Sequence, residues 1–165
     1  MSSRVETDRL RRILVATDGS PTARDAVGVA ADLAVEHGSE LIIVHVVPLV
    51  DTVRAPTIDE PAPAFLHVPN AYDHELLEEA AALAAEHGVV ATTALVPGSA
   101  VEEILSYSES HDVDLVVVGS HGHGAVLRFL HGSVARGVAR AAERSVLVVR
   151  AKHLSSTPHA EGAQH

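Results

Sequence analysis

Short aliphatic runs alternate with segments of helical periodicity along most of this chain. The runs are rich in Val, Ile and Leu and have the length of buried strands; they cover residues 12–17, 40–47, 89–96, 114–119 and 145–150. Between them, apolar residues recur every three or four positions, which is typical of a helix with one buried face. Strands that alternate with helices predict an α/β domain with a parallel sheet and right-handed crossovers.

Polar residues mark where the predicted helices begin. Ser20 followed by Pro21 has the pattern of an N-cap and a first helical residue. Asn70 precedes the next helical segment and is expected to cap it. Ser99 and Glu102 have the spacing of a capping box, in which each side chain accepts a hydrogen bond from the other residue's backbone N–H.

Three segments lack both strand and helix patterns. Residues 48–69 contain five prolines and several acids, which rules out a strand or a long helix. We expect this segment to form a long, mobile surface loop. Residues 1–10 and 151–165 are polar and are expected to be a flexible arm and a disordered tail. The folded domain is therefore predicted to span residues 11–150.

The composition narrows the classes of partner. With 165 residues, the chain is long enough for one domain with its own core. Hydrophobic residues make up 47% of it but aromatic residues only 2%, as expected for a parallel sheet packed with aliphatic side chains. The formal net charge of -10 disfavours nucleic acid and anionic membranes as partners. No apolar run has transmembrane length and no signal peptide is evident, so a cytoplasmic location is expected.

The segment 116–134 carries the clearest candidate chemistry. A β-branched run is followed by four glycines, at positions 119, 122, 124 and 132. Ser133 then has the position of a cap for a helix that begins near Val134. The first N–H groups of a helix have no internal partner and, with the helix dipole, attract anions. A strand, a glycine-rich loop and a helix start together predict a phosphate-binding site.

Two common phosphate-binding loops do not fit this segment. A Walker A loop needs Lys and Ser or Thr after its last glycine, whereas Ala125 and Val126 follow Gly124. A dinucleotide-binding loop needs a third glycine where Leu127 stands. The loop is therefore of another kind.

A longer pattern in the same segment does match a known family. Gly119, two residues, Gly122, nine residues, Gly132 and Ser133 have the spacing of the ATP-binding signature of the universal stress protein family, which this chain resembles. Val134 also suits that signature. The resemblance implies that Gly119 and Gly122 present backbone N–H groups to ribose and phosphate. It also implies that Gly132, Ser133 and Val134 meet the β- and γ-phosphates, with Ser133 able to bind Mg²⁺.

The resemblance extends over nearly the whole domain, from residue 12 to residue 150. It implies a Rossmann-like three-layer sandwich with a five-stranded parallel sheet in the order 3-2-1-4-5. In such a sheet, ligands bind beyond the carboxyl ends of the strands, where the strand order reverses. That point lies between the first and fourth strands, and both carry candidate site residues.

The ends of the first and second strands supply the other candidate site residues. By the resemblance, Asp18 contacts adenine and ribose, Val46 packs on the adenine ring, and Ala16 lines the adenine pocket through its backbone. Asp18 has an alternative role, which is to cap the helix that follows. His45 alternates to the other face of the strand from Val46, and we expect it to be a buried histidine with satisfied hydrogen bonds.

Catalytic and metal-binding residues are not evident. Fast phosphoryl transfer needs a positioned nucleophile and charge stabilisation, and neither can be assigned in this sequence. His121 and His123 could touch a transition metal, but no third ligand stands at a fixed spacing. We therefore expect no metal site and no catalytic residue, and at most slow ATP hydrolysis.

The expected function is that of an ATP-binding universal stress protein, which acts as a regulatory or protective module and takes ATP with Mg²⁺. Two alternatives stay open: a slow Mg²⁺-dependent ATPase and a nucleotide-free dimeric scaffold. Residues 145–150 are short, strongly β-prone and, in the family's strand order, at a sheet edge. Such an edge invites pairing, so a homodimer through this strand is expected.

Overall fold

The computed structural model describes residues 10–48, 69–120 and 132–150. Its elements alternate in the order β1 (Arg12–Ala16), α1 (Pro21–His37), β2 (Glu40–Val47), α2 (Ala71–Glu86), β3 (Ala91–Pro97), α3 (Ala100–Ser110), β4 (Leu115–Gly119), α4 (Ser133–Ala141) and β5 (Ser145–Val149). Residues 1–9 of the expected arm, residues 49–68 of the proline-rich loop and the whole tail, 151–165, lie outside the described residues. Residues 121–131 of the glycine-rich loop also lie outside them.

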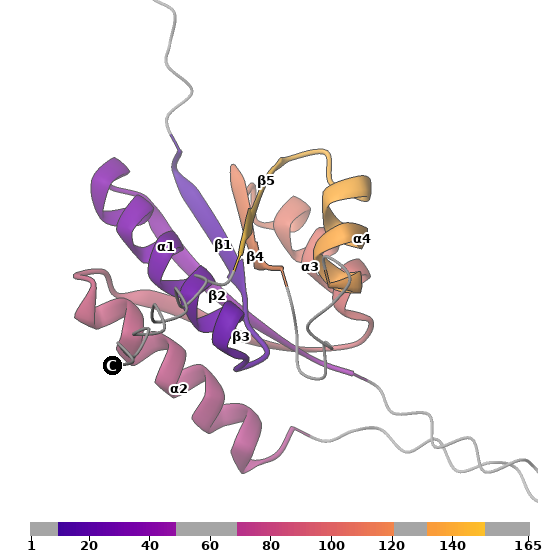
Figure 1. The fold of residues 1–165 in the computed structure, drawn as a ribbon, viewed down its shortest axis with the longest axis horizontal. Coiled ribbons are helices and arrows are strands. Elements are labelled where there is room, and N and C mark those ends of the chain that lie inside the picture. The colour runs from indigo at the N-terminus through magenta and orange to yellow at the C-terminus, as the bar shows by residue number, and fades with distance from the viewer. Residues whose placement is uncertain (1–9, 49–68, 121–131, 151–165) are drawn as a thin grey trace, which may run out of the picture.

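The five strands form one parallel sheet in the order β3-β2-β1-β4-β5, which confirms the predicted topology (Figure 1). β1 pairs with both β2 and β4, with Ile13 opposite Leu41 on one side and Leu115 on the other. It therefore lies at the centre, and its residues Leu14 and Val15 are fully buried.

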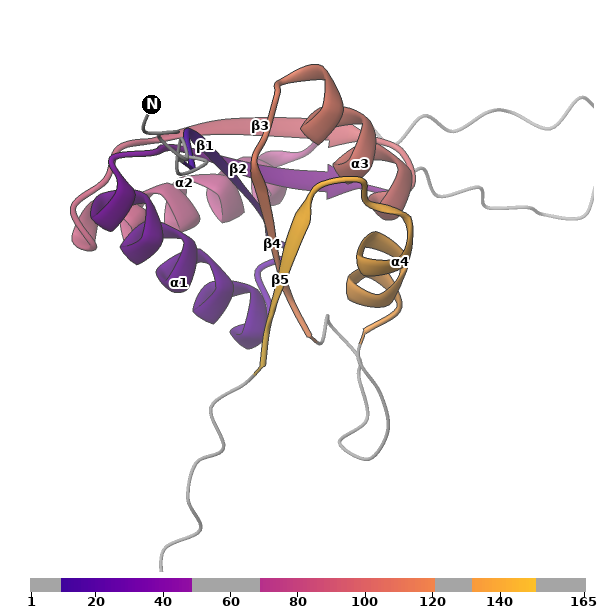
Figure 2. The same ribbon diagram turned by 90° about the horizontal axis from the view of Figure 1, so that it is seen from above.

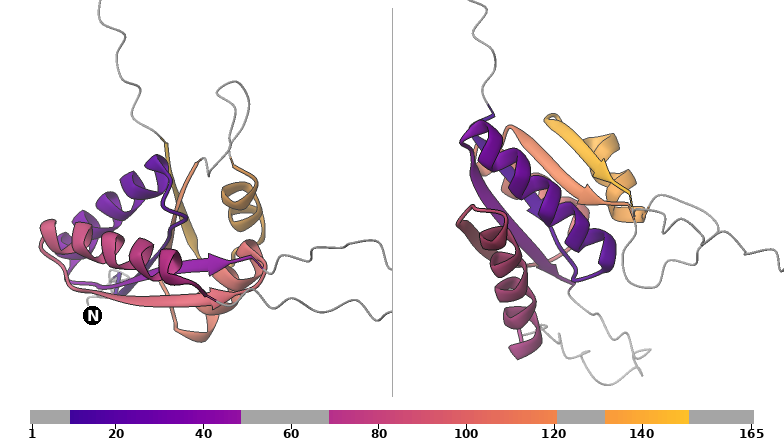
Figure 3. Two further views of the ribbon diagram at one scale, coloured as in Figure 1. Left: turned by 90° about the horizontal axis from the view of Figure 1, so that it is seen from below. Right: turned by 60° about the vertical axis from the view of Figure 1, so that its left-hand side comes forward.

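Helices cover both faces of the sheet, as Figures 2 and 3 show. Side chains alternate along β1, so Ile13 and Val15 pack in the cluster beneath α1 and α2, whereas Leu14 packs in the cluster beneath α3 and α4. The two aliphatic clusters make the three-layer sandwich that the family resemblance implies. Within residues 10–48, 69–120 and 132–150, no helix is long and apolar enough to cross a membrane.

The predicted caps differ in outcome. The Ser20 hydroxyl accepts a hydrogen bond from the Ala23 N–H at 3.2 Å, and Pro21 is the first residue of α1, as expected. Asn70 caps α2, and Asp73 completes a capping box there. The capping box expected between Ser99 and Glu102 is wrong.

Ser99 occupies the N-cap position of α3 without a side-chain cap bond. Its backbone carbonyl instead accepts from the Glu103 N–H at 2.9 Å, which starts the helix. A backbone hydrogen bond of this kind needs no particular side chain at Ser99. The spacing between Ser99 and Glu102 therefore did not predict how this helix begins.

The third strand begins later than the aliphatic pattern predicts. The Val89 N–H donates to the Ala84 carbonyl at 3.1 Å, so this valine takes part in the turn that ends α2 and not in the sheet. β3 then runs from Ala91 to Pro97 along the outer side of β2. Proline is tolerated there because it is the last residue of an edge strand.

Gly119, the last residue of β4, lies against the first turn of α1. A Cβ at this position would come within 2.9 Å of the Thr22 carbonyl carbon and oxygen and 3.0 Å of the Ala23 nitrogen. These are backbone atoms, which cannot rotate away. The absence of a side chain at Gly119 therefore lets β4 and the amino end of α1 meet.

Replacing Gly119 with Ala is expected to lower the free energy of unfolding by about 1–3 kcal/mol, because the new methyl group overlaps backbone atoms. Urea denaturation of both proteins measures this difference. Gly28→Ala is the matched control, since its Cβ would lie 3.4 Å from the nearest atoms, on the His87 ring, and alanine favours helix α1. Equal stability of the two variants would contradict the packing argument.

Candidate functional site

The carboxyl ends of the central strands bring the predicted ligand residues to one edge of the sheet. Ala16 ends β1, Val46 lies near the end of β2, and Gly119 ends β4. Ala16 and Val46 both pack partly buried against the core cluster beneath α3 and α4, and Val134 of α4 packs against the same cluster. Gly122 lies outside the described residues.

Asp18 stands on the turn between β1 and α1. Its Oδ1 accepts a hydrogen bond from the Ser20 N–H at 2.9 Å, and the neighbouring Thr17 hydroxyl accepts from the Gly19 N–H at 3.2 Å. Gly19 has φ +77°, a conformation that glycine adopts without strain. The carboxylate therefore forms the turn before α1, whereas the helix cap, which was its alternative role, is supplied by Ser20.

The amino end of α4 differs by one residue from the prediction. The N-cap is Gly132, not Ser133, which is the first helical residue and is exposed. The reason is that the Gly132 carbonyl accepts from the Arg136 N–H at 3.0 Å and so begins the helix. A glycine cap has no side chain to accept from the first-turn N–H groups, which favours an anion at this helix end.

Ser120 ties the glycine-rich loop to the rest of the sheet. Its carbonyl accepts a hydrogen bond from the Gly132 N–H, and its own N–H donates to the Val149 carbonyl of β5 at 2.7 Å. Ser120 is only 1% exposed. The two ends of the loop are therefore joined at a buried residue between β5 and α4.

His45 is buried, and both of its ring nitrogens have partners, as the sequence predicts. Nδ1 lies 2.9 Å from the Thr17 carbonyl oxygen, and Nε2 lies 3.1 Å from Asp73 Oδ1. Asp73 Oδ2 accepts from the Asn70 N–H at 2.9 Å. Asp73 was missed by the sequence reasoning, although the Asn-x-x-Asp spacing of a capping box marks it.

The sequence profile of the universal stress protein family matches residues 9–150. The chain belongs to the universal stress protein family. It is 33% identical over 150 residues to universal stress protein YxiE of Bacillus subtilis, a match that covers 84% of this chain and 98% of the relative. It is 30% identical over 144 residues to universal stress protein MJ0531 of Methanocaldococcus jannaschii, with coverage of 85% and 82%.

Solved structures agree with this membership. A universal stress protein crystallised in complex with cAMP superimposes with a TM-score of 0.64 at 26% identity, over 84% of this chain and 95% of the other. That relative shares the fold and binds an adenine nucleotide.

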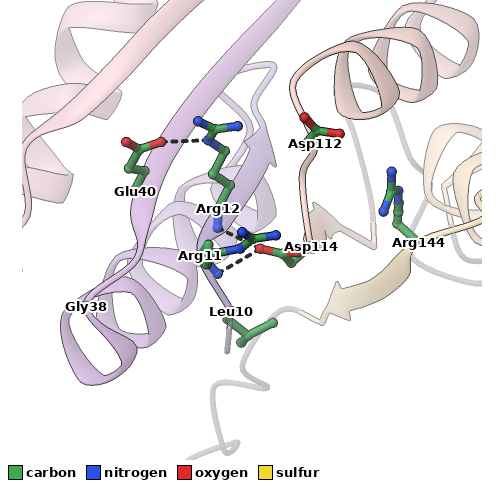
Figure 4. A pocket seen from close by; sticks show the side chains of 8 residues that line it. All are labelled: Leu10, Arg11, Arg12, Gly38, Glu40, Asp112, Asp114 and Arg144. Atoms are coloured by element: carbon green, nitrogen blue, oxygen red, sulfur yellow. Dashed lines mark hydrogen bonds and ion pairs between the residues drawn. The ribbon is translucent and has the colours of Figure 1, made fainter. Parts of the chain in front are cut away.

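A pocket of ≈ 690 Å³ lies at the opposite edge of this universal stress protein, at the amino ends of the strands (Figure 4). It is lined by Leu10, Arg11, Arg12, Gly38, Glu40, Asp112, Asp114 and Arg144. Asp114 Oδ2 accepts from the backbone N–H groups of Arg11 and Arg12 at 2.7 and 3.0 Å. This carboxylate thereby fastens the start of β1 to β4.

The Arg12 side chain joins two further segments at this edge. Its Nε donates to Glu40 Oε2 at 2.8 Å, and its Nη1 donates to the His111 carbonyl at 3.0 Å. The hydrogen bond to Glu40 and the charge of that carboxylate raise the pKa of Arg12. These groups hold the strand ends together, so we assign the pocket a structural role.

Replacing Asp18 with Asn is expected to leave the free energy of unfolding within about 0.5 kcal/mol of the parent, because the amide oxygen still accepts from Ser20. Asp18→Ala is expected to lower it by about 1 kcal/mol, the size of one net hydrogen bond. Chemical denaturation of the three proteins measures both effects. If Asp18→Asn lowered the free energy of unfolding as much as Asp18→Ala does, the turn-forming role of the acceptor oxygen would be contradicted.

Proposed function

We propose that this universal stress protein binds ATP with Mg²⁺ at the carboxyl edge of β1, β2 and β4, and acts as a regulatory or protective module in the stress response. The site would use Ala16, Asp18, Val46, Gly119, Gly122, Gly132, Ser133 and Val134. The cAMP complex of a relative supports an adenine nucleotide as the ligand.

The amino end of α4 is the feature that most favours a polyphosphate. Gly132 caps the helix without a side chain, and the exposed Ser133 follows it directly. The helix dipole and the first-turn N–H groups favour negative charge at this end. The Ser133 hydroxyl would donate to a phosphate oxygen or bind Mg²⁺.

The other end of the site suits a nucleobase. Ala16 and Val46 offer partly buried apolar surface on the same face of the sheet. Asp18 carries a carboxylate on the adjoining turn, which can accept a hydrogen bond from the adenine amine or a ribose hydroxyl. An apolar surface with one polar acceptor is the usual make-up of a small-molecule site.

Hydrolysis would be slow at such a site. Of the carboxylates described near this edge, Asp18 accepts from the Ser20 N–H, while Asp73 contacts His45 and accepts from the Asn70 N–H. Both are engaged in holding the fold, which disfavours either as a general base. A binding protein therefore fits these contacts better than the alternative of a Mg²⁺-dependent ATPase.

The parent protein, freed of bound nucleotide, is expected to bind MgATP in titration calorimetry. Gly132→Val should weaken binding at least about tenfold, because a branched side chain covers the helix end that receives the phosphates. Gly132→Ala is the control for the loss of glycine. Absence of heat from the folded parent protein would refute the proposal and favour a nucleotide-free scaffold.

We also propose that the protein forms a homodimer through β5. This strand pairs with β4 on one side. The Val149 carbonyl points to β4, where it accepts from Ser120, so the backbone groups of the preceding residue, Val148, point to the outer edge. Within the described ranges no strand pairs with that edge, and a second copy related by a two-fold axis would complete it.

Val148→Pro is expected to weaken the dimer at least about tenfold, because it removes one outward donor from each copy and leaves the β4–β5 ladder intact. Light scattering across a dilution series measures the change. Val148→Thr is the control, since it keeps the donor and the branched shape. A monomer mass for the parent protein at micromolar concentration would overturn the proposal.

A further inference from the structure

Arg136 carries a positive charge one turn into α4, close to the helix end where the proposed function places the phosphates. Its backbone N–H donates to the carbonyl of the cap residue, Gly132, at 3.0 Å. In an α-helix such a bond joins residues about one turn, or ~5.4 Å, apart along the axis. Residues three and four positions apart share one side of a helix, so Arg136 lies on the same side as Ser133 and Gly132.

The packing of α4 determines which way that side of the helix faces. Ala135 and Val138 are buried in the core cluster beneath α3 and α4. A Cβ at Gly137 would lie 2.7 Å from Val101 Cγ2, so α3 packs against that side of α4. The side that remains carries Arg136, which is exposed. Neither the sheet nor α3 therefore covers the Arg136 side chain.

The direction of helical side chains brings this charge to the amino end of α4. Side chains on a helix incline toward its amino terminus. An arginine side chain is longer than one helical turn, so the Arg136 guanidinium can reach an anion bound by the first-turn N–H groups. Arg140 is exposed on the same side but lies one turn farther from that end. Its guanidinium reaches only as far as the turn of Arg136.

The Arg136 side chain has no structural partner in the part of the chain that the structure describes. It makes no hydrogen bond or ion pair with residues 10–48, 69–120 or 132–150. Arg12, in contrast, donates to Glu40 and to the His111 carbonyl and so connects strand ends. The charge of Arg136 is therefore available to a ligand, and its removal should cost the fold little.

The charge of the whole chain gives this position weight. A formal net charge of -10 opposes the approach of a nucleotide, which is itself negative. Arg11, Arg12 and Arg144 line the pocket at the opposite edge of the sheet and do not offset this repulsion at the carboxyl edge. A guanidinium beside the amino end of α4 would do so, and it can donate two parallel hydrogen bonds to one phosphate group.

We infer that Arg136 is a phosphate-binding residue of this site, and that it makes the site prefer a nucleoside triphosphate to a monophosphate. The inference rests on the proposed function, in which the first turn of α4 receives the β- and γ-phosphates. AMP lacks both of these groups, so it gains little from a charge at this helix end. Arg136 thereby names the class of nucleotide that the site selects.

Titration calorimetry with MgATP and with AMP, on protein freed of bound nucleotide, tests this selection. Arg136→Gln removes the charge and keeps a side chain that favours a helix. We expect the affinity for MgATP to fall about fivefold, the upper range for an exposed ion pair. The affinity for AMP should change less than about twofold, so the preference for MgATP narrows.

Arg140→Gln is the matched control, because it removes the same charge from the same side of α4, one turn farther from the phosphates. It should leave the ratio of the two affinities within about twofold of the parent, since a distant exposed charge is screened by salt. Arg136→Lys keeps the charge without the planar fork and should lose less affinity for MgATP than Arg136→Gln. Urea denaturation confirms that each variant is folded before titration.

The outcomes separate this inference from the proposed function. If the parent binds both nucleotides and Arg136→Gln keeps the parent's ratio of affinities, Arg136 is a solvated surface residue; the inference is then overturned while the proposed function stands. An equal loss of MgATP affinity in Arg136→Gln and Arg140→Gln would also overturn it, because the effect would then be one of overall charge. If the folded parent binds neither nucleotide, the proposed function itself is refuted.

Discussion

The parallel pairing of β1 with both β2 and β4 is the constraint on which the architecture depends. Parallel strands need long crossovers, and a strand buried on both faces needs helices on each side of the sheet. The chain therefore winds outward from β1 to β3 with α1 and α2 on one face, then crosses to β4 with α3 and α4 on the other. The strand ends separate between β1 and β4, where such sheets bind ligands.

Residues at this edge have structural tasks of their own. Gly119 permits the contact between β4 and α1, Asp18 forms the turn after β1, and Ser120 joins β5 to the cap of α4. A ligand would meet backbone and side chains that the fold already holds in place. Such preorganisation reduces the conformational entropy that the protein loses when the ligand binds.

Local patterns were sufficient to predict the strands, the helices and the caps at Ser20 and Asn70, because these features depend on neighbours in the chain. The strand order came with the family resemblance. The contact of His45 with Asp73 joins residues 28 positions apart, and no local spacing encodes it. The shift of the α4 cap to Gly132 likewise depends on backbone geometry at the end of the loop rather than on which side chain is the better cap.

The hydrogen bond between the Gly132 N–H and the Ser120 carbonyl has a consequence for how this family can diversify. The two residues that flank the segment 121–131, Ser120 and Gly132, are therefore joined directly. For a segment closed in this way, doubling the length costs only about 0.6 kcal/mol of closure entropy. Insertions and substitutions between those two anchors can therefore accumulate without disturbing the strands, so that relatives can evolve different ligand preferences on an unchanged scaffold.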